Sequence, residues 1–431
     1  MITVDPLYGV IEIPTWLDKI ILTPEVQRLR EVRLINTSTP YFPALSDTRR
    51  FTHALGVLHL ALRLAPALEK DFSSEQMKAF LVSAVVHDVG TPAFGHVFEY
   101  LLEASTGWTH EGALLSIFNG LYRPDGPYHQ IYYGNALHLA SVLRSSGVNP
   151  DLVASYVSGQ SPVGQLIAGT IDLDNIDNVF RMACLLGLAP PDLRQPEDLV
   201  DGLTPTSDGP VFSPSAEPLI IAWKRLRRIV YEVLAFDESN LIGQTMLTDS
   251  LVAAMENGRI GEEHWFYTDE QLLQYLAREP EPEIYRPIQR FATGDYYSTI
   301  FVGWYDVPKG DTDLRLPSAR QDLKEALEQR LKVPCSPYVF YDRGTFEKNL
   351  QLRFWQDAES SANVEIRTLG RQSLSTLVGV FSYRRLETAS KKLIRAAEEV
   401  LADYGLSAVH LRPIPEKRTA YELPGQTKLP L

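Results

Sequence analysis

Two adjacent residues, His87 and Asp88, interrupt an apolar run that extends from Leu81 to Gly90. Burying an imidazole or a carboxylate without a partner is strongly unfavourable, and a helix that ends at a glycine offers neither group an obvious partner. A metal ion would supply one. One nitrogen and one hard oxygen suit Mn, Fe, Co, Ni or Zn, and Mg tolerates them. The pair therefore predicts a site for a divalent metal.

Other parts of the chain offer the further ligands that a metal site needs. His53 precedes an amphipathic stretch at 54–58 and is expected in the first turn of a helix. In the run 171–177, Asp174 and Asp177 are three residues apart and share a helix face, while Asp172 points elsewhere. One of these carboxylates would complete a set with positions left for water and substrate. Taken alone, an HD dipeptide is more often a chance occurrence than a metal site.

Six short motifs occur in the order found in the HD-domain dNTP triphosphohydrolases, which include the bacterial dGTPases. They lie at residues 5–12 (DPLYGVIE), 23–30 (TPEVQRLR), 50–57 (RFTHALGV), 87–96 (HDVGTPAFGH), 108–112 (WTHEG) and 169–174 (GTIDLD). The chain resembles this family over its first 185 residues or so. Weaker likeness continues at 199–202 and 227–249, and the last third carries no recognised motif.

The resemblance implies a set of metal ligands. The second aspartate of the family's I-D-x-D motif is the ligand, which favours Asp174 over Asp172. Asp172 and Asp177 are each expected to be solvated or to accept hydrogen bonds from N–H groups. The implied ligands of one divalent ion are His53, His87, Asp88 and Asp174, with Mn, Fe, Co, Ni, Zn and Mg left open.

The resemblance also implies catalytic and substrate-binding residues. Phosphate ester cleavage needs an activated water, a proton donor to the leaving oxygen and cations facing the phosphoryl oxygens. A histidine paired with a carboxylate suits the proton transfer, although the adjacent pair at 110–111 would, on its own, as often be a surface pair. The expected catalytic residues are Thr91, His96, Glu99, His110 and Glu111, and the expected substrate contacts are Arg28, Arg50, Asn175, Arg227 and Arg228.

Three departures from the family pattern bear on activity. Thr91 stands where much of the family has a histidine, and threonine cannot shuttle a proton near neutral pH. Altered proton handling is therefore expected. Leu34 replaces a glutamine that contacts the sugar 3′-hydroxyl, and Leu22 replaces an aspartate of the family's regulatory guanine nucleotide site. We expect weak discrimination at the 3′-position and turnover without a guanine nucleotide activator.

Composition is that of an ordinary globular protein, with 431 residues, 45% hydrophobic and 22% charged. The two cysteines, Cys184 and Cys335, fit no disulfide framework or zinc-finger spacing. The sequence contains no evident leader, and no run matches the roughly 18 apolar residues of a membrane helix. A cytoplasmic location without membrane association is expected.

Charge argues against a general nucleic-acid binder, because a net charge of -13 repels phosphate backbones. A local basic cluster at 224–228 is more often a solvated helix face. Its position in the family's phosphate-binding helix favours one arginine, Arg227 or Arg228, as a bidentate triphosphate contact.

The pattern along the chain predicts a mostly α protein, with an HD-domain helical core at 1–265 and a smaller α+β lobe at 266–414. Residues 16–186 are expected to be mostly helical, followed by a long loop at 187–218 with a hairpin near 207–209. Helices are predicted at 222–257, 269–278 and 385–404, and strands at 297–304 and 337–341. The tail at 415–431 is expected to be poorly ordered.

These features together predict a metal-dependent phosphohydrolase acting on a nucleotide, most specifically a dNTP triphosphohydrolase that releases deoxynucleoside and triphosphate. One alternative is an HD phosphatase that removes phosphates singly from a nucleotide or a specialised metabolite. Another is a regulatory protein that binds nucleotides without turnover. A homo-oligomer of two or four copies is expected from the resemblance.

Overall fold

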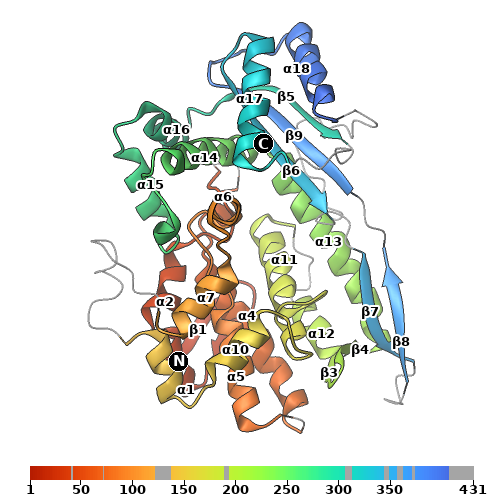
Figure 1. Ribbon diagram of the computed structural model, residues 1–431. Helices are drawn as coiled ribbons and strands as arrows, with labels where there is room; N and C mark the ends of the chain where they lie inside the picture. The colour runs from red at the N-terminus through yellow and green to blue at the C-terminus, as the bar shows by residue number, and fades with distance from the viewer. Residues whose placement is uncertain are drawn as a thin grey trace, which may run out of the picture.

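The computed structural model describes residues 1–39, 42–70, 72–121, 137–188, 194–305, 313–343, 349–356, 363–370 and 374–406. The protein is mostly helical, which confirms the predicted fold class (Figure 1). The tail predicted to be poorly ordered lies outside the described residues.

A bundle of helices forms the N-terminal half, and a short hairpin precedes it. Strands β1 (Ile2–Asp5) and β2 (Gly9–Glu12) pair antiparallel. The helices that follow are α1 (Thr15–Ile21), α2 (Pro24–Arg28), α3 (Pro43–Ser46), α4 (Arg50–Leu68), α5 (Ser74–Val86), α6 (His96–Thr106), α7 (His110–Phe118), α9 (Leu139–Ser145), α10 (Pro150–Val157) and α11 (Leu173–Leu185), with 3₁₀ turns η1 (Leu29–Glu31) and η2 (Gly164–Leu166). Helix α4 packs against both α5 and α11. The helices that carry or adjoin the RFTHALGV, HDVGTPAFGH and GTIDLD motifs therefore meet in the core.

A second group of elements follows α11. It consists of α12 (Gln195–Asp201), β3 (Leu203–Thr206), β4 (Gly209–Phe212), η3 (Pro214–Ala216), α13 (Glu217–Phe236), α14 (Glu238–Glu256), η4 (Glu262–His264), α15 (Asp269–Ala277) and α16 (Pro282–Thr293). Helix α13 packs along α11. Asp237 ends α13 and caps α14 by accepting a hydrogen bond from the Asn240 amide at 2.7 Å.

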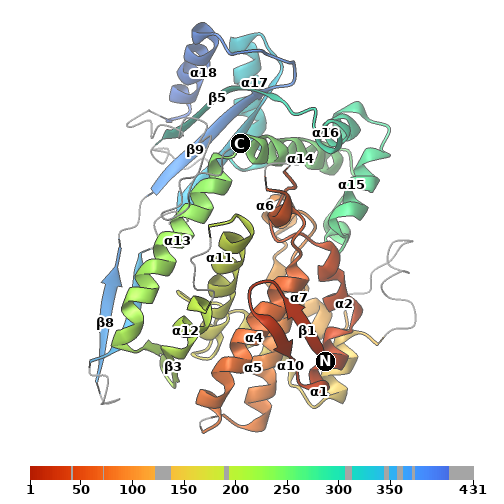
Figure 2. The same cartoon turned by 180° about the vertical axis from the view of Figure 1, so that it is seen from behind.

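The C-terminal elements combine strands and helices, as predicted. They are β5 (Ser298–Tyr305), α17 (Pro317–Leu331), β6 (Cys335–Arg343), β7 (Leu350–Trp355), β8 (Val364–Leu369), β9 (Leu374–Ser382) and α18 (Lys391–Asp403). Strands β5, β9 and β6 form an antiparallel sheet in that order, with α17 packed on β6 and α18 on β5. Strands β7 and β8 join the β3–β4 hairpin in a second sheet and lie alongside α13 in both ribbon views (Figures 1 and 2).

Several local predictions are confirmed and others are corrected. The hairpin near 207–209 is present as β3 and β4, and the expected strands are present. The last helix, expected at 385–404, begins only at Lys391. The predicted loop at 187–218 contains α12, which proline at its first turn helps to start. The helices expected at 222–257 are α13 and α14, and Asp237 separates them by capping the second. The β1–β2 hairpin was not predicted.

Helix α4 corrects the expectation about membrane-length segments. Its 19 residues, Arg50–Leu68, are long and apolar enough to cross a membrane by length and composition alone. However, 56% of that stretch is buried within the protein, as in the central helix of a helical core. The hydrophobicity of α4 reflects its contacts with α5 and α11 on different sides.

Candidate metal and catalytic site

Side chains from α4, from the end of α5 and from α11 converge on one point in the core. His53 Nε2 lies 3.2 Å from His87 Nε2, 2.9 Å from Asp174 Oδ1 and 3.9 Å from Asp88 Oδ2. His87 Nε2 lies 3.6 Å from Asp88 Oδ2 and 3.8 Å from Asp174 Oδ1. Ligands held about 2.0–2.1 Å from one ion are roughly 3–3.5 Å apart, which this spacing approaches. The structure thus brings the four expected ligands together.

The donor set fits a divalent metal. Asp88 Oδ1 accepts hydrogen bonds from Arg50 Nη1 at 2.8 Å and Thr91 Oγ1 at 3.0 Å, whereas the buried Oδ2 has no hydrogen-bond partner. His87 Nδ1 donates to the Ala84 carbonyl at 3.0 Å, which leaves Nε2 as the free nitrogen. An unpartnered buried carboxylate oxygen beside two imidazole nitrogens is what a metal ligand looks like without its ion. The identity of the metal stays open.

Charge balance keeps Asp88 ionised. Burial alone would raise the pKa of Asp88, but Arg50, His87 and His53 outweigh it and hold that pKa well below the usual range. Asp174 is the most exposed of the four ligands, with 36% of its side chain accessible. The site is therefore open on the side of α11, and a substrate can approach from there.

Asp177 orients His53 and corrects the expectation that it is an ordinary helix acid. The fully buried Asp177 carboxylate accepts a hydrogen bond from His53 Nδ1 at 2.6 Å. Arg181 pairs with both Asp177 oxygens at 2.8 Å and reaches Asp5 at 2.9 Å. Burial would lower the pKa of His53, but hydrogen bonds to Asp174 and Asp177 raise it to about 10. A histidine held through one nitrogen presents the other in a fixed direction.

A glycine on α4 makes room for this buried ion pair. A Cβ atom on Gly56 would lie 2.0 Å from Asp177 Oδ1 and 2.3 Å from Arg181 Nη2. Both neighbours are held by two or more partners, so neither can move aside cheaply. The glycine in the RFTHALGV motif is therefore explained by the close approach of α11 to α4.

The first acid of the GTIDLD motif, Asp172, has a structural role, as expected. Asp172 caps α11 by accepting a hydrogen bond from the Asn175 amide at 2.6 Å. The Asn175 side chain donates to both Asp172 oxygens, at 2.9 and 3.0 Å. The side-chain nitrogen of Asn175 is therefore committed to the helix cap, and the role of Asn175 as a substrate contact stays a prediction.

Glu99 links the last histidine of the HDVGTPAFGH motif with the histidine of the WTHEG motif in an acid and base group. Glu99 bridges two histidines: Oε2 lies 2.7 Å from His96 Nδ1, and Oε1 makes a short hydrogen bond with His110 Nδ1. Burial works against the charge on Glu99, but these two partners hold the pKa of Glu99 well below its usual range. Burial would lower the pKa of His110, but Glu99, Glu111 and Asp88 raise it.

The expected proton donor, His110, therefore lies close enough to the metal ligand Asp88 to be influenced by its charge. The pKa of His110 is raised above the usual value of histidine. His110 also lies against the HD turn, since a Cβ on Gly90 would be 2.3 Å from the His110 carbonyl oxygen. Glu111 lies 3.3 Å from His110 Nε2 and is half exposed. The Thr91 hydroxyl donates a hydrogen bond to Asp88, so Thr91 positions a metal ligand and is not a proton carrier.

Arg28 is not a substrate contact, which corrects that prediction. Its side chain is fully buried and donates to the carbonyls of Thr91 at 2.7 Å and Phe266 at 2.9 Å, with further bonds to Val89, Trp265 and Tyr267. Arg50 keeps one donor, because its buried Nε has no hydrogen-bond partner among the described residues. Arg28 therefore holds the HD turn, while Arg50 lies beside Asp88 with one donor that has no partner among the described residues.

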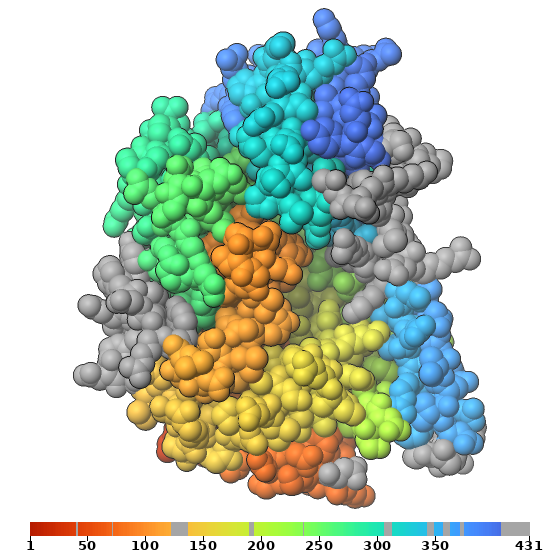
Figure 3. Space-filling view, viewed as in Figure 1, coloured from red at the N-terminus to blue at the C-terminus, as the bar shows by residue number. Residues whose placement is uncertain are grey.

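The two arginines of α13 are separated by their helix faces. Arg228 is half exposed and bonds Glu232 Oε1 at 2.8 Å, one turn along the same helix. Arg227 is 8% exposed and stacks on Tyr231 at 4.6 Å, and Tyr231 lies within electrostatic reach of Asp174. The structure places Arg227 on the side of the site and Arg228 on the solvent side. The space-filling view shows a hollow between α7 and the C-terminal strands, with α11 and α13 at its bottom (Figure 3).

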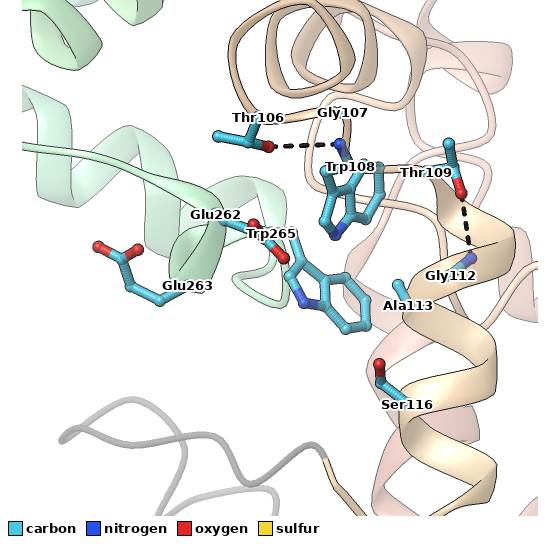
Figure 4. Close-up of a pocket in the computed structure, with 10 residues that line it drawn as sticks. All are labelled: Thr106, Gly107, Trp108, Thr109, Gly112, Ala113, Ser116, Glu262, Glu263 and Trp265. Carbon is cyan, nitrogen blue, oxygen red and sulfur yellow. Dashed lines mark hydrogen bonds between the residues drawn. The ribbon is translucent and has the colours of Figure 1, made fainter.

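A separate pocket lies behind the start of α7 and does not include the metal ligands. Its volume is about 560 Å³, and Trp108 and Trp265 face each other across it with ring centroids 5.7 Å apart (Figure 4). Glu262 and Glu263 lie at one side, and Thr109 is engaged in capping α7.

Comparison with known proteins agrees with this site. Residues 50–121 match the HD domain family, and this segment contains His53, His87 and Asp88. The bovine and human proteins named deoxynucleoside triphosphate triphosphohydrolase SAMHD1 are each 34% identical to this chain, over 140 and 131 residues. These matches cover 30% and 28% of this chain and 24% and 21% of the relatives, so the chain matches about a quarter of their length or less. The predicted resemblance is confirmed.

The fold as a whole has a solved counterpart. A crystal structure named as a phosphohydrolase from Bacteroides thetaiotaomicron covers 89% of this chain and 100% of its own length, with a TM-score of 0.64 and 16% identity. At this identity the likeness shows a shared fold. It extends far beyond the matched HD domain and includes most of the C-terminal elements.

Asp177 provides the first test of the site. We expect Asp177→Asn to weaken divalent metal binding by about 10- to 100-fold, because His53 loses the carboxylate that fixes its ring. Metal affinity is measured by isothermal titration of the metal-free protein. The matched control is Asp201→Asn, which removes an ion pair between Arg63 and α12 away from the site and should leave metal affinity unchanged. Unchanged affinity in Asp177→Asn would contradict this role.

Glu99 provides a pH test. If protonated His110 is the proton donor, kcat is highest below the raised pKa of His110 and falls as pH rises through it. Glu99→Gln removes the charge that raises this pKa, so the falling limb should move to lower pH by on the order of one unit. Glu103→Gln, one turn further along α6, is the control and should keep the wild-type profile. A shift to higher pH, or no shift, would refute the assignment.

Proposed function

Because residues 50–121 of this chain form an HD domain, we propose that the protein is a metal-dependent phosphohydrolase that acts on nucleotides, and specifically a dNTP triphosphohydrolase. The observation that carries the proposal is the convergence of two histidines and two aspartates beside a histidine and glutamate pair. Phosphate ester hydrolysis requires both sets, because it needs charge neutralisation and a proton donor at the same centre.

Each part of the site has a role in this reaction. His53, His87, Asp88 and Asp174 would hold a divalent ion, which when bound would act as a Lewis acid toward phosphoryl oxygen and water. Arg50, and Arg227 from α13, would bind the negatively charged phosphate oxygens. His110, charged by its contact with Glu99, would donate a proton to the leaving oxygen. His96 shares Glu99 and is the most exposed of the group, with 59% of its side chain accessible.

The substrate class follows from the relatives and from the charges. The relatives named as dNTP triphosphohydrolases match this chain at 34% identity over 140 and 131 residues, and this likeness supports a dNTP as substrate. Arg50 on α4 and Arg227 on α13 supply the positive charge that a polyphosphate would need. A homo-oligomer of two or four copies and a cytoplasmic location belong to the same proposal.

A stepwise phosphatase is the second candidate function, and the threonine at position 91 supports it. The family's usual histidine at this position is absent, so the proton supply differs from that of typical relatives. The metal ligands, and the two histidines bridged by Glu99, would serve either reaction equally well.

The two histidines bridged by Glu99 are compatible with both reactions, so the products decide between them.

A product analysis tests the proposed function. The wild-type protein is incubated with each of the four dNTPs, the four NTPs and 2′,3′-dideoxy triphosphates, with Mn, Fe, Co, Ni, Zn or Mg, and the phosphates are resolved by ion-exchange chromatography. We expect deoxynucleoside and intact triphosphate in a 1:1 ratio, because cleavage occurs at the α-phosphate. Asp88→Ala should lose bound metal and lower the rate by several orders of magnitude.

Other products would change the conclusion. Inorganic phosphate released one group at a time would establish the stepwise phosphatase. Tight nucleotide binding without turnover under every metal would establish the regulatory protein. Full turnover by Asp88→Ala would contradict the metal site itself.

A further inference from the structure

The turn that leads into α6 has an unusual backbone. Phe94 and Gly95 both have positive φ angles, +59° and +51°, and they directly precede His96. A bulky side chain rarely adopts this left-handed conformation, because its Cβ crowds the following carbonyl group. Phe94 is also 97% buried, with only 3% of its surface exposed. Such a turn persists only where its surroundings hold it.

Asp269, far away in the sequence, holds this turn. Its side chain is 1% exposed, and Oδ1 accepts a hydrogen bond from the Phe94 amide at 2.9 Å. The other oxygen, Oδ2, accepts from the Arg33 amide at 2.9 Å and from Arg33 Nη1 at 3.3 Å. Asp269 is the first residue of α15, where the helix dipole favours a negative charge.

The two segments that Asp269 joins also contact each other next to His96. Immediately after Arg33, the Leu34 carbonyl lies 3.5 Å from Arg50 Nη2, and Asn36 Oδ1 accepts a hydrogen bond from the His96 amide at 3.3 Å. A Cβ on Gly95 would lie 2.8 Å from Asn36 Oδ1 and 3.1 Å from Arg50 Nη2. One carboxylate therefore fixes the spacing between the segment that carries Asn36 and the turn that carries His96.

The segment just before α15 is anchored to the HD turn as well. Arg28 donates to the carbonyls of Trp265, Phe266 and Tyr267 on one side and to those of Val89 and Thr91 on the other. Asp269 is thus mounted on a segment that cannot shift independently of the HD turn. This support lies outside residues 50–121, where the HD domain is matched.

We infer that Asp269 is a positioning residue that sets the place of His96, and with it the Glu99 bridge, for the proposed hydrolysis. This inference rests on the proposed function. Asp269 touches neither the metal ligands nor His96 directly, so it acts through the Phe94–Gly95 turn and through Arg33.

Asp269→Asn is the variant that tests this inference. Asparagine has the same shape but only one acceptor oxygen, so it cannot accept from both Phe94 and Arg33. We expect kcat to fall by about 10- to 100-fold while KM and metal content stay within about threefold of wild type, since displacement of a catalytic group by about 1 Å has effects of this size.

The matched control is Asp249→Asn. Asp249 is likewise a mostly buried acid, with 7% of its side chain exposed, and it pairs with Arg320 and Ser336 at the C-terminal lobe, away from the site. This variant should lower the melting temperature without lowering kcat. Equal losses of kcat in the two variants would reduce Asp269 to a general stability role and overturn the inference.

A double-variant comparison shows whether Asp269 acts through His96. In a His96→Ala background, Asp269→Asn should lower kcat by less than about twofold further, because neighbouring residues in one pathway are not additive. A double variant whose loss equals the product of the two single losses would overturn the inference.

Hydrogen exchange gives a readout that does not need activity. In Asp269→Asn, amide exchange in a peptide covering residues 91–97 should accelerate, whereas exchange in α4 should not. Unchanged exchange at this turn would refute the role of Asp269 in holding it. A wild-type protein without any hydrolytic activity would be a failure of the proposed function, while an active wild type with an equally active Asp269→Asn variant would be a failure of this inference alone.

Discussion

The burial of several ionisable groups between α4, α5 and α11 is the constraint on which the rest of the structure depends. Asp88 and Asp177 are acids in the core, and each needs opposite charge and hydrogen bonds to stay ionised there. Removing one partner from such a buried pair typically costs roughly 3–5 kcal/mol. Arg50 neutralises Asp88, and Arg181 neutralises Asp177, so the centre can hold two histidines and several carboxylates without unfolding.

This constraint explains features of the fold that would otherwise look unrelated. Gly56 is small because the Asp177 and Arg181 pair presses against α4. The β1 strand contributes Asp5 to the same network, which ties the N-terminal hairpin to α11. One oxygen of Asp88 remains without a hydrogen bond, although its other oxygen has two. The network therefore leaves Asp88 Oδ2 without a hydrogen bond beside the two histidines, at a point where a divalent ion fits.

The sequence was sufficient to predict the helical fold class, the mixed C-terminal lobe and the group of ligands that converge. His87 and Asp88 are predicted from their place in an apolar run, and His53 and Asp174 from motifs that resemble those of the family. Asp177 was misjudged, although its position three residues after Asp174 and four before Arg181 was a usable signal. Arg28 was assigned to substrate because its motif does not reveal whether the side chain points inward. Asp269 carries no local signal, since its partners are 175 and 236 residues away.

The most direct test of the account is to locate the metal in a crystal of the full chain soaked with Mn. Anomalous scattering collected near the metal absorption edge should give one strong peak between His53, His87, Asp88 and Asp174. The same crystal form of Asp88→Ala should lack that peak. A strong peak elsewhere in the chain, or an unchanged peak in Asp88→Ala, would contradict the claim that these four residues form the metal site.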